Sequence, residues 1–283
     1  HHASEVIGMD EHPGQALRKK KDASVVVATS LVRDNRCDAV IAPGSTGAAV
    51  AAALFGLGRI KGIDRPVIAT PMPTVSGITV MLDSGANSNS KPKHLVQGAL
   101  MGSEYAKLLL GKENPTVGLL NIGEEATKGN DVVLATYPIL EGMKTINFKG
   151  NIEGRDIPKG AVDVVVCDGF VGNVVLKFAE GLVTGLTQLV KDSIMAGSIF
   201  AKIGAMLVKP ALKKMAKRLD HTENGGAPLL GVNGVFMIAH GSSKAKEIKT
   251  AIEIASDLVE RKIIQHIRET MDIEGALKYD YDE

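Results

Sequence analysis

Short apolar runs rich in β-branched residues recur along the chain, and each ends at a cluster of Gly, Asn or Asp before a stretch of helical pattern. This order is typical of βαβ units around a parallel sheet. The clearest runs, at 39–42, 117–121 and 162–167, are apolar throughout, as strands buried on both faces should be. The pattern therefore predicts an α/β fold built from βαβ units around a mostly parallel sheet.

The rest of the chain fits one α/β domain over residues 1–283, because no linker or repeat divides it. Two more strands are predicted around a turn at 75–77. After Asp168, apolar residues repeat at helical spacing and predict a helix running toward Ile194. A long amphipathic helix, from Ser243 to about Thr270, is predicted to close the fold.

The segment 195–219 combines cations with apolar residues and contains no acid. We expect it to form the tip and return of a helical hairpin over 173–225, divided at Gly197, Gly204 and Pro210. One interpretation is a dimer contact with solvated lysines; the other is a tip that enters the headgroup boundary of an anionic membrane. The apolar residues that would make that contact are Ile199, Phe200, Ile203, Met206, Leu207 and Val208.

Composition narrows the class of protein. With a net charge of +1, the chain has no overall field that would favour a nucleic acid partner. Its two cysteines, Cys37 and Cys167, suit a reducing cytoplasm and exclude a disulfide scaffold. No uninterrupted apolar run reaches the roughly 18 residues of a membrane span. We therefore expect a cytoplasmic protein, attached at most to a membrane surface.

Candidate chemistry lies in the loops that follow the strands, where parallel sheets bind ligands. After the first strand comes PGSTGA, in which Gly44 and Gly47 leave the backbone conformationally unrestricted and Ser45 and Thr46 supply hydroxyl donors. It is either a phosphate cradle or a capped turn into a helix.

Three further loops carry polar side chains. Asp83 and Asn87 either bind a ligand or anchor their own loop through Asx-type hydrogen bonds. The loop after 117–121 carries more polar side chains than a turn needs. Its candidates are Asn121, Glu125 and Lys128. The loop and helix start after 162–167 contribute Asp168, Gly169, Gly172, Asn173 and Lys177.

Two residues allow competing interpretations. Cys167 follows a buried strand with no histidine nearby in sequence, which favours a buried thiol over a nucleophile. His240, at the end of the strand VFMIA, is either a structural histidine or an active-site donor. No carboxylates or histidines have metal-ligand spacing, so we expect no metal and no cofactor.

The loops taken together resemble one family. PGSTGA, GRIKGIDRP, LDSGAN, GLLNIGEEATKGN, FKGNIEGRD, CDGFVGNVVLK, NGGAPLLG and AHGSS stand in the order found in the bacterial acyl-ACP:phosphate acyltransferases of phospholipid synthesis. The resemblance implies a three-layer α/β/α fold, similar to that of phosphotransacetylases and isocitrate dehydrogenases, and a homodimer whose paired helices project from the core. It also implies transfer of an acyl group from acyl carrier protein to inorganic phosphate, for a membrane-bound glycerol-3-phosphate acyltransferase.

Relatives begin with a strand and a loop of the type DAMGGD, and nothing in this sequence matches that loop. Part of the phosphate site is therefore expected in residues outside this sequence. Within it, we expect the backbone N–H groups of 44–47 and 169–173, with Asn121, Asn173, Lys128 and Lys177, to hold phosphate and developing charge. His240 is expected to protonate the departing sulfur. The alternatives are a phosphotransacetylase using an acyl-CoA and a noncatalytic scaffold recruited to the membrane.

Overall fold

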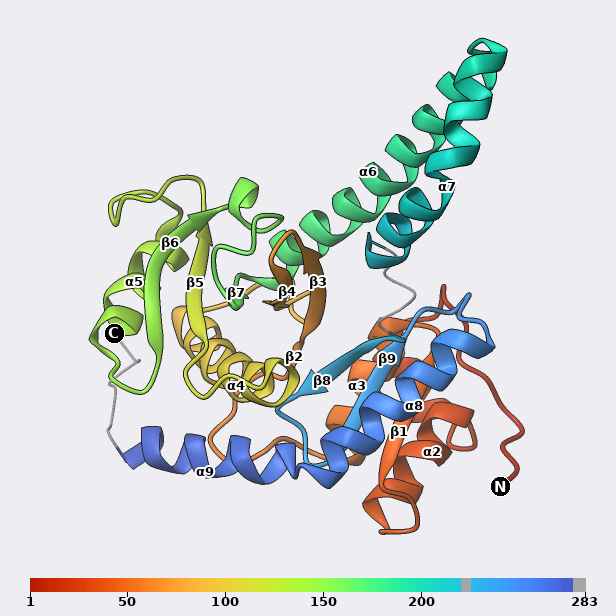
Figure 1. The fold of residues 1–283 in the computed structure, drawn as a ribbon. Helices are drawn as coiled ribbons and strands as arrows, with labels where there is room; N and C mark the ends of the chain where they lie inside the picture. The colour runs from red at the N-terminus through yellow and green to blue at the C-terminus, as the bar shows by residue number, and fades with distance from the viewer. Residues whose placement is uncertain (220–224, 277–283) are drawn as a thin grey trace.

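The computed structural model describes residues 1–219 and 225–276, and consists of two β-sheets with helices packed on them and a helical hairpin that projects far from the body (Figure 1). The strands are β1 (Ala39–Pro43), β2 (Val67–Ile68), β3 (Thr70–Thr74), β4 (Gly77–Leu82), β5 (Thr116–Asn121), β6 (Asn147–Glu153), β7 (Val164–Val166), β8 (Ala227–Leu230) and β9 (Val235–Ala239). The helices are α1 (Pro13–Lys19), α2 (Ser24–Arg33), α3 (Thr46–Gly56), α4 (Pro92–Leu110), α5 (Asp131–Gly142), α6 (Gly169–Ala196), α7 (Ile199–Leu219), α8 (Ala245–Glu260) and α9 (Ile263–Ala276), with a 3₁₀ turn, η1 (Gly154–Asp156).

The predicted strands are present, but they form two sheets. The first has the order β1-β9-β8-β2 and the second β3-β4-β7-β5-β6. Four of the seven strand pairings are parallel: β1 with β9, β4 with β7, and β5 with both β6 and β7. The chain passes from the first sheet to the second between β2 and β3, across Ala69.

The continuous apolar runs are explained by burial on both faces. In β9, Val235 and Met237 pack in a core with α8, while Phe236 and Ile238 pack in another with α2 and α3. In β7, Val164 and Val166 face α4, whereas Val165 packs toward the start of α6. Because side chains alternate across a strand, each sheet lies between two helical layers. The expected α/β/α layering is confirmed.

Two predicted helix boundaries are wrong. Gly197 does end α6, with extended backbone, but α7 runs through both Gly204 and Pro210 to Leu219. Within a helix, glycine costs only about 1 kcal/mol relative to alanine, and a proline commonly kinks a helix without ending it. Residues 220–224 of the expected hairpin lie outside the described residues. By length and a mean hydropathy of 1.2 alone, α6 would be long enough to cross a membrane.

The single closing helix is also wrong, because the chain turns at Arg261 and Lys262. Lys262 adopts a positive φ of 54°, which ends α8 and starts α9 in a new direction. The turn lets α9 pack on α4, the central helix, whose residues from Leu95 to Ala106 are all buried. Ile263, Ile267 and Met271 of α9 join that core.

Candidate functional site at the strand ends

The carboxyl ends of β4, β7 and β5 lie side by side. Leu82 of β4 and Leu119 of β5 both pair with Val166 of β7. The loops that begin at Asp83, Asn121 and Cys167 therefore leave the sheet at the same edge. In Figure 1 this edge lies on the side of the molecule from which α6 and α7 project.

Asp83 is the centre of a buried hydrogen-bond network. Its carboxylate accepts five hydrogen bonds, from the backbone N–H groups of Ile68, Gly85, Ala86 and Asn87 and from Asn87 Nδ2, over 2.8–3.1 Å. Burial raises the pKa of the Asp83 carboxyl, and these hydrogen bonds oppose the rise. Asn87 Nδ2 also donates to Pro66 O at 2.7 Å. Both side chains hold their own loop, which is the anchoring alternative from the sequence.

The N-terminus of α6 is packed tightly against this loop. A Cβ at Gly169 would lie 2.4 Å from Asn87 O, and one at Gly172 only 2.0 Å from Asp83 O. Asp168 caps the helix, with Oδ1 accepting from Val171 N at 2.9 Å. The two glycines are therefore required by packing between the loops, and the helix N-terminus is brought to the strand-end edge.

Asn173 and Lys177 continue along the exposed side of α6. Asn173 lies against Gly85, where an added Cβ would be 3.4 Å from its Cγ. Lys177 Nζ pairs with Glu180 at 2.8 Å. Asn173 thus joins the strand-end group directly, whereas Lys177 stands one turn farther out with a carboxylate partner.

The loop after β5 is held by two asparagine side chains. Asn121 Nδ2 donates to Lys128 O at 2.8 Å, and its Oδ1 accepts from Ile122 N at 2.8 Å. Asn151 Nδ2, from β6, donates to Glu125 O at 2.9 Å. The side chains of Glu125 and Lys128 remain exposed and both lie over Gly123, where a Cβ would be 2.8 Å from Glu125 Oε2 and 3.1 Å from Lys128 Cγ.

Asn121 is thus occupied in shaping the loop, and Asn151 was missed by sequence reasoning. No local signal distinguishes Asn151 from any other polar residue of a strand, because its role depends on a contact with a different loop.

The first sheet contributes a second pair of strand-end loops. Pro43 and Ala239 are paired at the ends of β1 and β9, so the loops that start at Gly44 and His240 adjoin. Ser45 caps α3 by accepting from Ala48 N at 3.4 Å, with Thr46 and Gly47 opening that helix.

At His240, the Nδ1 atom accepts from Ser242 N at 3.2 Å and lies 2.6 Å from Ser242 Oγ. An Nδ1 that accepts a hydrogen bond places the proton of the neutral ring on Nε2.

The loop at 83–87 makes contacts with both sheets, and so connects the strand-end loops of the first sheet with those of the second. Asp83 accepts from Ile68 N in the first sheet, and Ala86 packs on the core that contains Ile68, Phe236 and Ile238. The structure therefore links the 83–87, 121–130 and 168–173 loops at one sheet, and places the 44–47 and 240–242 loops together at the other.

Cys167 lies buried beneath these loops, with Sγ 3.7 Å from Asp83 O. Burial, followed by the nearby charges of Asp83 and Asp168, raises the pKa of the thiol well above its usual value. A thiol so disposed is a poor source of thiolate.

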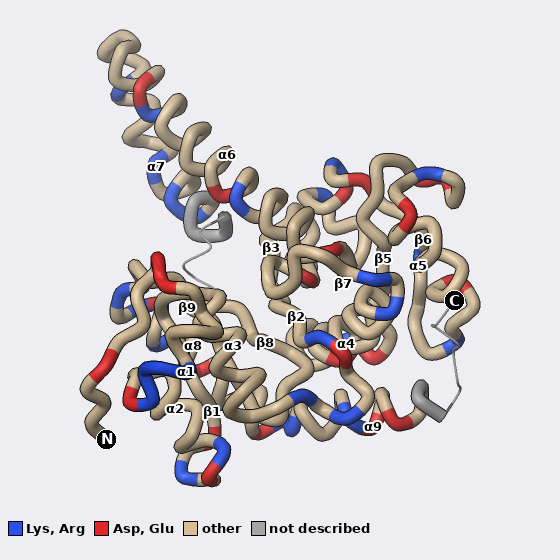
Figure 2. Tube along the Cα trace, turned by 180° about the vertical axis from the view of Figure 1, so that it is seen from behind, with Lys and Arg blue, Asp and Glu red and all other residues tan. Residues whose placement is uncertain are grey.

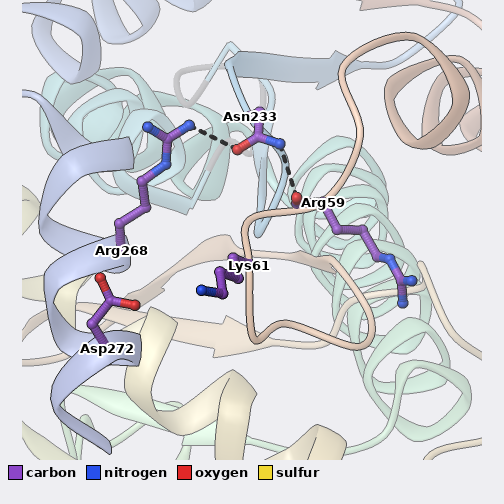
Figure 3. A pocket seen from close by; sticks show the side chains of 5 residues that line it. All are labelled: Arg59, Lys61, Asn233, Arg268 and Asp272. Atoms are coloured by element: carbon purple, nitrogen blue, oxygen red, sulfur yellow. Dashed lines mark hydrogen bonds between the residues drawn. The ribbon is translucent and has the colours of Figure 1, made fainter. Parts of the chain in front are cut away.

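One pocket lies away from these loops. It has a volume of about 410 Å³ and is lined by Arg59, Lys61, Asn233, Arg268 and Asp272 (Figure 3). Asn233 precedes β9, whereas His240 follows it, so this pocket is at the opposite end of the strand. Arg268 donates to Asn233 Oδ1 at 2.7 Å, and Asn233 Nδ2 donates to Arg59 O at 2.8 Å. These contacts tie α9 to the 57–61 loop. Within residues 1–219 and 225–276, no group of three or more His, Cys, Asp or Glu could hold a metal ion.

Comparison with known proteins agrees with this architecture. A family model described as "Fatty acid synthesis protein" matches residues 1–266. The phosphate acyltransferase of Desulfitobacterium hafniense (strain DSM 10664 / DCB-2) is 57% identical over 270 residues, covering 95% of this chain and 80% of the relative. That of Heliobacterium modesticaldum is 58% identical over 267 residues, covering 94% and 79%.

Among solved structures, the EutD phosphotransacetylase from Staphylococcus aureus matches with a TM-score of 0.58 at 14% identity, covering 87% of this chain and 70% of its own. A branched-chain phosphotransacylase from Enterococcus faecalis matches with a TM-score of 0.54 at 15% identity, covering 84% and 79%. These two likenesses show a shared fold. The sequence matches show more: this chain belongs to the fatty acid synthesis protein family, together with the phosphate acyltransferases.

Proposed function

We propose that this protein transfers a long-chain fatty acyl group from the thioester of acyl carrier protein to inorganic phosphate, giving the acyl phosphate used in phospholipid synthesis. The observation that carries the proposal is the meeting of polar loops at the carboxyl ends of β4, β7 and β5, with a capped helix N-terminus among them. Free N–H groups at a helix N-terminus attract anions such as phosphate. The family relationship supplies the reaction class.

The chemistry requires positioning more than it requires a reactive side chain. A phosphate oxygen attacks the thioester carbonyl carbon, and the carbonyl electron pair moves onto oxygen. When the carbonyl re-forms, the carbon–sulfur bond breaks and its electron pair leaves with sulfur. The site must hold phosphate close to the carbonyl and stabilise the oxyanion.

The strand-end residues fall into two groups: those we propose to bind the substrate, and those that hold the loops in place. Lys128, Lys177 and Asn173, with the backbone N–H groups of 45–47 and 169–170, are the groups we propose to meet phosphate and the oxyanion. The other expected N–H donors, those of Gly44, Val171 and Gly172, already donate to Ala239 O, Asp168 Oδ1 and Asp168 O. Asp83, Asn87, Asp168, Gly169 and Gly172 shape the loops that carry them. Glu125 stands beside Lys128. His240 is our candidate to protonate the departing thiolate. Only the imidazolium form of the ring can do so, because loss of the proton from the neutral ring would leave an imidazolate.

The decisive experiment measures phosphate-dependent release of free carrier protein from palmitoyl-acyl carrier protein. We expect turnover with that substrate and little with acetyl-CoA, because a long chain and a carrier surface both contribute binding. Preference for the CoA thioester would point to a phosphotransacetylase activity instead. No turnover with either donor would leave the scaffold interpretation.

The projecting hairpin is our proposed dimer contact. Along α6, apolar residues recur every three or four positions and are 47% to 68% exposed in the single chain. They are Phe170, Val174, Phe178, Leu182, Leu186 and Leu189. Such a stripe on a helix that stands clear of the body is suited to packing on the same helix of a second copy. Sedimentation of the protein should give a dimer; a monomer at micromolar concentration would contradict this contact.

The far part of the hairpin is our proposed membrane contact. Ile199, Phe200, Ile203, Met206, Leu207 and Val208 are 45% to 80% exposed at the start of α7. Figure 2 shows Lys and Arg along α7, and the sequence has no acid between residues 193 and 219. Apolar residues among cations fit reversible attachment to an anionic surface. Attachment would place the labile acyl phosphate near a membrane-bound acyltransferase on the cytoplasmic side.

A further inference from the structure

We infer that Asn151 is a positioning residue, which holds the loop after β5 in the conformation where Lys128 meets phosphate. The inference rests on the proposed function for the role of Lys128. Asn151 lies in β6, is 6% exposed, and donates from Nδ2 to Glu125 O at 2.9 Å. The same carbonyl accepts from Lys128 N at 3.1 Å, so one oxygen joins the strand, the turn and the lysine.

A β-bulge brings Asn151 to this position. Phe148 pairs with Val117, but Asn151, and not Gly150, pairs with Leu119, so β6 carries one extra residue at this point. Gly150 has a positive φ of 89° within the bulge. Since side chains alternate along a strand, the extra residue turns Asn151 to the face that Leu119 shares with the α4 core. Regular pairing would have pointed it to the opposite face, away from its contact with Glu125 O.

The Asn151 side chain is not well suited to stabilising the fold. Its Oδ1 is buried and has no hydrogen-bond partner among the described residues. Turning the amide over would set Oδ1 against Glu125 O, so the donation to that carbonyl determines its orientation. A buried acceptor without a partner is unfavourable for folding. An asparagine at position 151 is therefore better explained by its contact with the loop after β5 than by a contribution to the stability of the core.

The test replaces Asn151 by valine, which suits a strand and removes both the donor and the unpaired acceptor. We expect the melting temperature to stay near that of the unaltered protein, amide hydrogen exchange at 122–129 to accelerate, and the KM for phosphate to rise about tenfold. The KM for the acyl donor should change little. A misplacement of about 1 Å in a site can cost about a hundredfold in rate, so tenfold is a modest expectation. Asn151→Ala provides a second variant if valine does not fold.

Asn147→Ala is the matched control. Asn147 lies in the same strand and also donates its amide to a backbone carbonyl, Asn114 O at 3.3 Å, at the other end of β6. This variant should keep its phosphate kinetics. Unchanged exchange at 122–129 in Asn151→Val would overturn the inference, as would equal kinetic losses in the control. If the loop loosens but Lys128→Ala leaves phosphate kinetics unaltered, the role proposed for Lys128 fails, and Asn151 remains only the holder of its loop.

Discussion

At the scale of single residues, some side chains of the strand-end loops fix the loop backbone, whereas others are exposed and are our proposed contacts with the substrate. Lys128 has its backbone held at both its N–H and its carbonyl, by Glu125 O and Asn121 Nδ2, while its side chain is exposed. A cation on a fixed backbone is suited to an anionic substrate, because little order is lost on binding. Asn173 has a similar placement, on the first turns of a capped helix.

Lys128→Ala, Asn173→Ala and Lys177→Ala should each lower acyl phosphate formation by at least about tenfold, the scale of a lost oxyanion or phosphate contact. Initial rates measured across phosphate concentrations will show whether each loss lies in KM or in kcat. Folding should survive, because all three side chains are exposed. Wild-type rates in all three variants would show that the proposed site is wrong.

Cys167→Ser should remain active. Direct attack by phosphate needs no thiol, and burial raises the pKa of Cys167, which disfavours the thiolate. Rates with palmitoyl-acyl carrier protein should stay within about threefold, whereas loss of a true nucleophile costs many orders of magnitude. Mass spectrometry of the quenched reaction provides the control, and an acyl group on Cys167 would overturn the direct mechanism.

At the scale of elements, the proposed site depends on how closely α6 approaches the loop after β4. Gly172→Ala should lower the free energy of unfolding by about 1–3 kcal/mol, because its Cβ would lie 2.0 Å from Asp83 O and 3.0 Å from Cys167 Sγ. Denaturant titration measures the loss. Activity should fall as well, since the same contact positions the Asp168–Asn173 helix start.

Gly185→Ala is the control for this effect, in the same helix. Nothing lies within 4 Å of a Cβ at Gly185, so alanine should raise helix stability by up to about 1 kcal/mol. Equal stabilities of the two variants would mean that α6 does not pack on the 83–87 loop as described.

At the scale of the whole molecule, the hairpin projects from the body (Figure 1), and its far part is our proposed membrane contact. Leu207→Glu together with Val208→Glu should abolish binding to vesicles containing anionic lipid, because two charges would enter the headgroup boundary. Turnover in solution and the dimer should be unchanged. Flotation of the protein with vesicles measures the effect.

Ile252→Glu is the matched control. It places a charge on a half-exposed apolar position of α8, outside the hairpin, and should leave vesicle binding intact. Undiminished binding by the Leu207/Val208 variant, or its collapse to inactive monomers, would return these residues to an ordinary packing role.

The sequence by itself determined the elements whose causes are local. Runs such as VVV in β7 predict strands buried on both faces, and the side chains of Ser45, Asn130 and Asp168 cap the helices that follow them. The order of polar loops also predicts the edge of the sheet at which we propose the site, because parallel strands end at the same edge.

Only the tertiary structure decided features that depend on contacts between distant segments. The division into two sheets, the packing of Gly172 on Asp83 O and the bulge that turns Asn151 to Glu125 each join residues far apart in the chain. The continuation of α7 through Pro210 could not be predicted either, because local propensity is a weak preference that neighbouring turns of helix can override. Residue spacing predicts the periodicity of helices and strands and the residues that cap helices. It does not predict which surfaces of these elements pack together.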